Sequence, residues 1–153
     1  VVGFNYRMTS LQAALGLAQL RKIDKLLEKK RRIARIYEGI LSNTPGITLY
    51  PSLPWAKPSY WLYSIIIDEK LYGLSRDRLM LELKKKSIET RKFFYPLHTM
   101  PAFKKHIVSD GNYPVSTYLS EHGMNLPSGP KISNEDILKV AEAIKQLHKE
   151  ISE

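Results

Sequence analysis

Two short segments hold most of the residues that could do chemistry, and the first stands at the beginning of the sequence. Residues 3–9 read Gly-Phe-Asn-Tyr-Arg-Met-Thr, a polar and aromatic run directly before a predicted helix. The first N–H groups of a helix have no intrahelical partner, and with the helix dipole they attract anions. Asn5 and Arg7 therefore stand where a phosphate could bind, and the same residues would equally serve as an ordinary surface cap.

The second segment, residues 91–98, reads Arg-Lys-Phe-Phe-Tyr-Pro-Leu-His and completes a predicted strand. On a strand Arg91 and Phe93 share one face, because side chains alternate. A proline then opens a loop that carries Tyr95 and His98. A guanidinium, aromatic rings and an imidazole at a strand end suit a phosphorylated ligand with a ring that can stack. Ordinary aromatic packing at a strand end would produce the same pattern.

Other kinds of site have less support in the sequence. Arg91 could be structural, since Glu89 and Asp68 on the same predicted sheet offer carboxylates for an ion pair. The histidines show no ligand-like spacing and have no cluster of carboxylates beside them, so no metal site is predicted. Neither a nucleophile–base pair nor a glycine-rich phosphate loop is visible.

The first element that must position these segments is a long helix predicted over residues 9–42. Thr9 is a good N-cap, Gln12 completes a capping box, and apolar residues recur at helical spacing. A helix of this length suits packing against a further body. Without such a body, we expect these members of its apolar stripe to be partly exposed: Leu15, Ala18, Ile23 and Leu27.

The rest of the chain alternates between strand and helix patterns. Strands are predicted at residues 47–50, 60–68 and 88–94, and helices at 75–86, 113–121 and from 133 onward. Residues 125–130, Asn-Leu-Pro-Ser-Gly-Pro, are predicted to be irregular. The sum is one α+β two-layer domain over residues 1–153, with a long N-terminal helix, a small mostly antiparallel sheet and covering helices.

Composition narrows the class of protein. There is no run of 18 apolar residues, no signal-peptide pattern and no cysteine, which fits a cytoplasmic protein without membrane spans or disulfides. The net charge is +9, and most of the excess lies in residues 21–35 and 84–86. Such a surface can serve nucleic acid, anionic lipid or phosphorylated small molecules, or it can simply be the solvated face of helices.

Three stretches resemble one enzyme family. Residues 3–9, followed by Leu-Gln-Ala-Ala at 11–14 and Gly-Leu-Ala-Gln-Leu at 16–20, resemble the start of the C-terminal part of sugar aminotransferases of the DegT/DnrJ/EryC1/StrS family. Residues 88–91 with 93–101, and residues 113–115 with 123–130, resemble its perosamine synthase branch, and the resemblance covers essentially the whole chain. Ser87 stands where such sequences usually have Gly, and Lys92 where Pro is usual.

The resemblance implies the C-terminal small domain of a fold-type I enzyme whose large domain carries pyridoxal 5'-phosphate. The lysine that holds the cofactor would lie upstream, so no catalytic residue is assigned here and the chain alone is expected to be inactive. The resemblance assigns Asn5 to the cofactor phosphate of the neighbouring subunit in a homodimer. We assign substrate binding to Arg7, Arg91, Tyr95 and His98. The substrates would be glutamate and a nucleotide-linked 4-keto-6-deoxy sugar, with guanosine the first base to test.

Two other classes of protein fit parts of the same sequence. A basic nucleic-acid-binding module would need basic residues along one face with exposed aromatic rings, and no binding motif of that class is visible. A purely structural or dimerisation domain would use the long helix as its contact surface. The family resemblance favours the aminotransferase over both, with no nucleic acid or membrane as partner.

Overall fold

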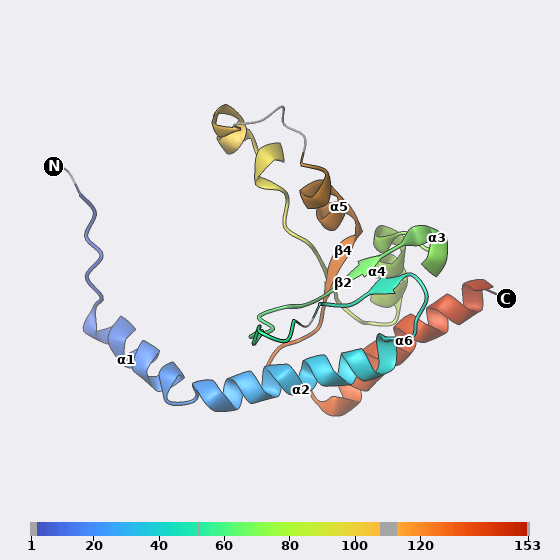
Figure 1. The fold of residues 1–153 in the computed structure, drawn as a ribbon. Helices are drawn as coiled ribbons and strands as arrows, with labels where there is room; N and C mark the ends of the chain where they lie inside the picture. Colours follow the sequence, from blue (N-terminus) through green and yellow to red (C-terminus); the bar gives the residue numbers. More distant parts are fainter. Residues whose placement is uncertain (1–2, 52, 108–112, 153) are drawn as a thin grey trace.

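The computed structural model describes residues 3–51, 53–107 and 113–152. The helices are α1 (Ser10–Leu20), α2 (Ile23–Leu41), α3 (Glu69–Tyr72), α4 (Arg76–Lys85), α5 (Pro114–His122) and α6 (Asn134–Ser152), with short 3₁₀ helices at Leu97–Thr99 and Pro101–His106; the strands are β1 (Ile47–Thr48), β2 (Tyr63–Ile67), β3 (Arg91–Lys92) and β4 (Gly123–Leu126). The strands form an antiparallel sheet in the order β1-β2-β4-β3, with α2 and α6 packed together beneath it (Figure 1). The predicted α+β two-layer fold is confirmed.

The N-terminal helical segment begins as predicted but is not one helix. The Oγ1 atom of Thr9 accepts from the backbone N–H of Gln12 at 3.3 Å, and Oε1 of Gln12 accepts from the N–H of Thr9 at 2.9 Å, so the capping box is confirmed. The prediction of a single helix over 9–42 is wrong, because Lys22 leaves helical geometry with φ −114° and ψ 1°. The sequence contains a sign of this break, because the helical spacing of the apolar residues shifts by one position. The residues before the shift are Leu11, Ala14, Leu15 and Ala18, and those after it are Ile23, Leu26 and Leu27.

One of the two interior strands of the sheet, β4, is not predicted by the sequence. β4 pairs with both β2 and β3, although irregular chain is predicted from Asn125 onward. Gly123 and Asn125 are poor strand formers. Burial along the whole of β4 outweighs that local preference, because an unpaired backbone in this position would lose its hydrogen bonds. β3 is also shorter than the predicted strand at 88–94.

The C-terminal end of α4 explains why β3 begins late. Ser75 caps the start of α4 as predicted, accepting from the N–H of Arg78 at 3.3 Å. At the other end Ser87 has a φ of 61°, and Ile88 donates to the carbonyl of Leu83 at 2.9 Å, which makes a Schellman cap. Ile88 and Leu83 are both buried. Left-handed backbone favours glycine at the position of Ser87, where the resembling sequences usually have it.

The core lies between the sheet and the helices beneath it. Tyr37 of α2 stacks on Tyr63 of β2 with ring centroids 4.9 Å apart, and its hydroxyl donates to the carbonyl of Pro127 at 2.8 Å. The hydroxyl of Tyr72 donates to the carbonyl of Ile144 at 2.7 Å. Burial raises the pKa of all three tyrosines. These rings therefore join α2, α3, α6 and the sheet while keeping the Tyr37 and Tyr72 hydroxyls hydrogen-bonded.

The first part of the chain stands apart from this core. Figure 1 shows residues 3–9 and α1 extending away from the sheet, and no residue of α1 is buried. Leu15 is 65% exposed, Ala18 and Ile23 are exposed and Leu27 is half-buried, so the expected exposure of the stripe is confirmed. Among the described residues, no helix is both long and apolar enough to cross a bilayer.

Candidate functional site

The sheet has a second face, opposite α2 and α6, and the centre of that face is polar. Ser64, Asn125 and Arg91 lie side by side across β2, β4 and β3. The hydroxyl of Ser64 donates to Oδ1 of Asn125 at 2.7 Å, and Nδ2 of Asn125 donates to the carbonyl of Lys92 at 3.2 Å. Asn125 is buried with its amide bonded on both sides, so it fixes both neighbouring strands and leaves the exposed Arg91 at the end of the row.

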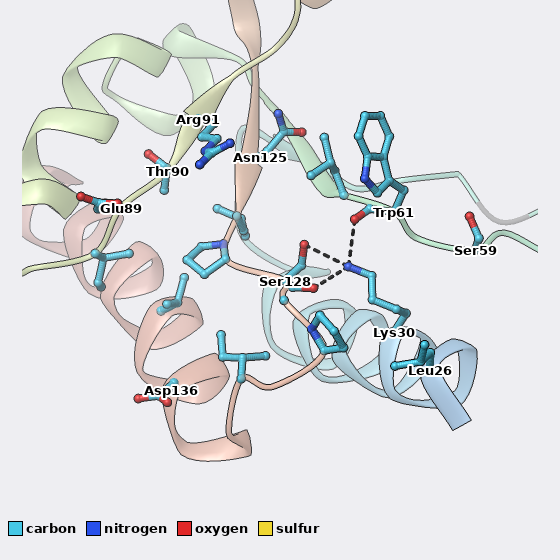
Figure 2. A pocket seen from close by; sticks show the side chains of 18 of the residues that line it. Leu26, Lys30, Ser59, Trp61, Glu89, Thr90, Arg91, Asn125, Ser128 and Asp136 are labelled. Atoms are coloured by element: carbon cyan, nitrogen blue, oxygen red, sulfur yellow. Dashed lines mark hydrogen bonds between the residues drawn. The ribbon is translucent and has the colours of Figure 1, made fainter. Parts of the chain in front are cut away.

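Two residues of this row, Asn125 and Arg91, also line a cleft of about 970 Å³ that lies between the start of α2, the start of α6 and the ends of the strands (Figure 2). The volume lies within the usual range for sites that bind small molecules. Apolar residues from α2, α6 and the loop after β4 line one side of it: Leu26, Leu27, Pro127, Ile132 and Val140. Polar side chains line the rest, chiefly Lys30, Asn125, Ser128, Arg91 and Glu89. The cleft therefore combines apolar contact area with a small number of charged groups.

Lys30 closes one end of the cleft from α2. Its Nζ donates to the carbonyl of Trp61 at 2.9 Å and also to the carbonyl of Ser128 (Figure 2). Burial lowers the pKa of Lys30. The hydroxyl of Ser128 in turn accepts from the N–H of Tyr63 at 3.2 Å. The ammonium group of Lys30 thus connects α2 to the start of β2 and to the loop after β4. These hydrogen bonds stabilise the wall of the cleft.

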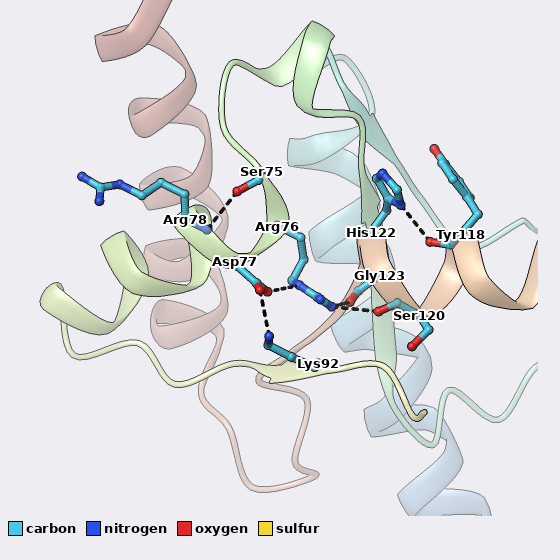
Figure 3. Close-up of polar contacts among 9 residues, drawn as sticks. All are labelled: Ser75, Arg76, Asp77, Arg78, Lys92, Tyr118, Ser120, His122 and Gly123. Carbon is cyan, nitrogen blue, oxygen red and sulfur yellow. Dashed lines mark hydrogen bonds and ion pairs between the residues drawn. The ribbon is translucent and has the colours of Figure 1, made fainter. Parts of the chain in front are cut away.

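A second polar network holds β3 from the far side (Figure 3). Arg76 is only 8% exposed, and its NH1 donates to the carbonyls of Gly123 at 2.7 Å and Ser120 at 3.1 Å. Arg76 also pairs with Asp77, whose other oxygen accepts from Nζ of Lys92 at 2.8 Å. The bond from Lys92, and then the Arg76 contact, lowers the pKa of Asp77. Because Lys92 follows Arg91, this network sets the position of β3 at the cleft.

The relatives of the chain decide what kind of protein carries this cleft. The model of the DegT/DnrJ/EryC1/StrS aminotransferase family matches residues 1–145. The chain belongs to this family. It is 40% identical over 145 residues to a GDP-perosamine synthase of Vibrio cholerae, covering 95% of this chain and 39% of that protein. It is 33% identical to a dTDP-4-amino-4,6-dideoxy-D-glucose transaminase of Escherichia coli, covering 93% of this chain and 38% of the relative.

Solved structures of family members have the same fold. The structure of DesV from S. venezuelae, in complex with a ketimine intermediate, superposes with a TM-score of 0.87 at 25% identity and covers 97% of this chain and 39% of that one. A family aminotransferase from Brucella abortus gives 0.81 at 30% identity, covering 96% of this chain and 38% of that one. The chain therefore spans about two fifths of the length of the relatives it matches. The predicted family is confirmed.

The residues predicted to bind substrate do not all meet in this chain. Arg91 lines the cleft, and no carboxylate of the described ranges pairs with it; Asp68 instead caps α3. Tyr95 is exposed in the loop beyond β3. His98 lies further along, with its Nε2 3.4 Å from the hydroxyl of Thr117 and its ring against Tyr113. The described residues hold no group of three or more metal-ligating side chains.

Asn5 and Arg7 belong to residues 3–9, the arm that extends away from the sheet (Figure 1), and neither residue lines the cleft. Oδ1 of Asn5 accepts from the backbone N–H of Arg7 at 3.0 Å, and the Nδ2 group is the donor of this side chain. Within the described part of the chain Nδ2 donates to no partner. An exposed amide donor two residues from an arginine is of a type that can bind a phosphate group.

Sequence reasoning missed three residues that shape the cleft. Lys30 appears in the sequence as one of many basic residues on a helix, and Asn125 as part of an irregular segment. Only the tertiary structure shows that each has partners on distant segments. Trp61 falls within the strand predicted at 60–68 and continues the alternation of Tyr63, Ile65 and Ile67, so the sequence gives no sign that its side chain is exposed.

Proposed function

We propose that this chain is the C-terminal domain of a pyridoxal-phosphate-dependent aminotransferase that aminates a nucleotide-linked 4-keto-6-deoxy sugar. The observation that carries the proposal is membership of the sugar aminotransferase family over residues 1–145. The coverage of about two fifths of each relative supports the assignment to one domain of a larger enzyme. Two relatives are named for nucleotide-linked amino sugars, which supports a nucleotide sugar as the substrate. The name GDP-perosamine synthase makes guanosine the first base to test.

The residues of the chain would bind and orient the substrate. Arg91 stands exposed on the polar face of the sheet and offers paired N–H donors that suit a diphosphate. Tyr95 and His98 lie on the loop that follows it and would contribute a phenol and an imidazole. Arg7 comes from the arm, so it would reach the site of the neighbouring subunit in a homodimer. In each case the group positions the sugar nucleotide and does not attack it.

Pyridoxal phosphate, when bound, supplies the electron-sink chemistry of the reaction. In this chain Asn5 would hold its phosphate through the Nδ2 donor, across the dimer interface. None of the lysines here is assigned to carry the cofactor. Lys30, the lysine that lines the cleft beside Trp61, has its Nζ engaged by two backbone carbonyls. We therefore also propose that the 153-residue chain alone is inactive.

The test is an amination assay with the protein encoded together with its upstream sequence. Glutamate and a GDP-linked 4-keto-6-deoxy hexose should give the GDP-linked 4-amino sugar, detected by mass. A dTDP-linked substrate tests the base. The purified chain of 153 residues should show no stable aldimine absorbance that borohydride removes with a mass gain on one lysine. Transfer to a different acceptor class by the longer protein, or amination by the chain alone, would contradict the proposal.

A further inference from the structure

The backbone directly before Trp61 adopts a conformation that side chains other than glycine rarely take. Tyr60 has a φ of 48°, in the left-handed region. It is held there by a hydrogen bond from its hydroxyl to Oε1 of Glu38 at 3.3 Å and by ring contacts with Tyr50 and Tyr63 at 5.6 and 6.1 Å. Strained backbone that the surroundings maintain is concentrated at functional sites. Here the strained residue immediately precedes an exposed tryptophan.

Trp61 is also fixed from the side of α2. Its carbonyl accepts the 2.9 Å hydrogen bond from the partly buried Lys30, while its side chain remains 73% exposed. Figure 2 shows the indole turned away from α2, on the side of the cleft where Arg91 and Asn125 lie. Two separate contacts therefore hold the backbone of a residue whose large ring faces solvent. A fixed ring loses less freedom when a ligand stacks on it.

A second aromatic ring and a cation complete the group. Phe94 lies nearly parallel to Trp61, with centroids 6.1 Å apart and planes at 17°, and it is 70% exposed. Arg91 stands three residues before Phe94 and lines the same cleft as Trp61. The described residues offer it no carboxylate partner. Paired exposed rings suit the flat face of a heterocycle, and an unpaired guanidinium suits a phosphate.

We infer that the Trp61–Phe94 pair is the stacking platform for the base of a nucleotide, whose phosphates meet Arg91. The inference deepens the proposed function and rests on it, because it names the part of the nucleotide sugar that this face recognises. The ligand class is a nucleoside diphosphate, and the GDP-perosamine synthase relative makes GDP the first to test. A base contributes a π-face and a diphosphate contributes the charge, so one molecule satisfies both features of the surface.

The chain has two tryptophans, which allows each to be observed alone. Trp55 is 82% exposed and does not line the cleft, so Trp55→Phe leaves Trp61 as the only indole reporter. GDP should quench the fluorescence of this variant in a saturable way. Trp61→Ala should raise the Kd for GDP, measured by calorimetry, about tenfold, as expected for loss of base stacking. Trp55→Ala is the matched control and should leave the Kd unchanged.

Two further probes separate the base from the phosphates. Pyrophosphate should bind wild type and Trp61→Ala equally and lose affinity on Arg91→Ala, whereas guanosine should respond to Trp61→Ala alone. The platform is overturned if GDP binds Trp61→Ala as tightly as wild type, or if millimolar GDP leaves Trp61 fluorescence unchanged. Circular dichroism checks that both variants remain folded. If GDP binding depends on Trp61 but the longer protein fails the amination assay, the proposed function falls and the platform stands.

Discussion

The layer that contains the sheet and the N-terminal segment that contains α1 differ in how deeply their apolar side chains are buried. In the sheet layer the apolar residues meet one another, and Leu41 of α2 is fully buried. On α1 a leucine of the same size, Leu15, is 65% exposed, and before α1 Phe4 and Tyr6 are 86% and 87% exposed. Exposed apolar surface of this extent usually marks an interaction site. The contrast supports α1 as an interdomain or intersubunit element and the sheet layer as the folding unit.

The largest expected effect comes from truncating the same residue type in the two regions. Leu41→Ala should lower the free energy of unfolding by about 3 kcal/mol, since it removes buried methyl groups and leaves a cavity. Leu15→Ala should change it by less than about 0.5 kcal/mol. Urea unfolding followed by circular dichroism measures both. Equal losses for the two variants would mean that α1 is packed in solution, and the contrast between the regions would be lost.

Arg76 tests whether the polar network belongs to the folding unit. Arg76→Met should cost about 2–3 kcal/mol, because the carbonyls of Ser120 and Gly123 lose their donor and Asp77 loses a cation. Arg78 is the matched control: it lies on the same helix but pairs with Glu82 at the surface, so Arg78→Met should cost less than about 0.5 kcal/mol. If the two substitutions cost the same, Arg76 does not hold β3 and β4 together.

Asn5 tests the other region, where stability should not change. In the longer protein Asn5→Ala should weaken cofactor affinity by about 1–3 kcal/mol, as expected on losing a hydrogen bond to a charged group. Its unfolding free energy should stay that of wild type, because Asn5 is exposed. Asn43→Ala, at an exposed position after α2, provides the comparison. Cofactor titration measures the effect. Unchanged affinity would mean that Asn5 has only a local role, in capping the turn before Arg7.

The smallest expected effect concerns Ser87, the left-handed residue that follows α4. Ser87→Gly should raise the free energy of unfolding by about 0.5–1 kcal/mol, since glycine adopts a φ of 61° without strain. The same change at Ser42, whose φ of −55° is helical, should instead destabilise the protein by up to about 1 kcal/mol. Opposite signs are therefore expected in thermal melts. A loss of stability at Ser87 would show that its hydroxyl matters more than its backbone.

The sequence predicted best where local chemistry decides the structure. Thr9 with Gln12, Ser75, and the alternation from Tyr63 to Ile67 are local signals, and each is found as expected. β4 was missed because its strand character comes from neighbours on both sides and not from Gly123 and Asn125 themselves. The roles of Lys30 and Arg76 were missed for the same reason. Each depends on partners 31 or more residues away, which no periodicity reveals.

The most direct test of the central claim is steady-state and half-reaction kinetics of Arg91→Ala in the longer protein. The claim is that the polar face of the sheet binds the nucleotide sugar. Arg91 is exposed and has no ion pair in the described ranges, so its loss should leave thermal stability unchanged. The KM for the sugar nucleotide should rise about tenfold or more while the half-reaction with glutamate proceeds at the wild-type rate. A parallel fall of both half-reactions together with the melting temperature would contradict the account and make Arg91 structural.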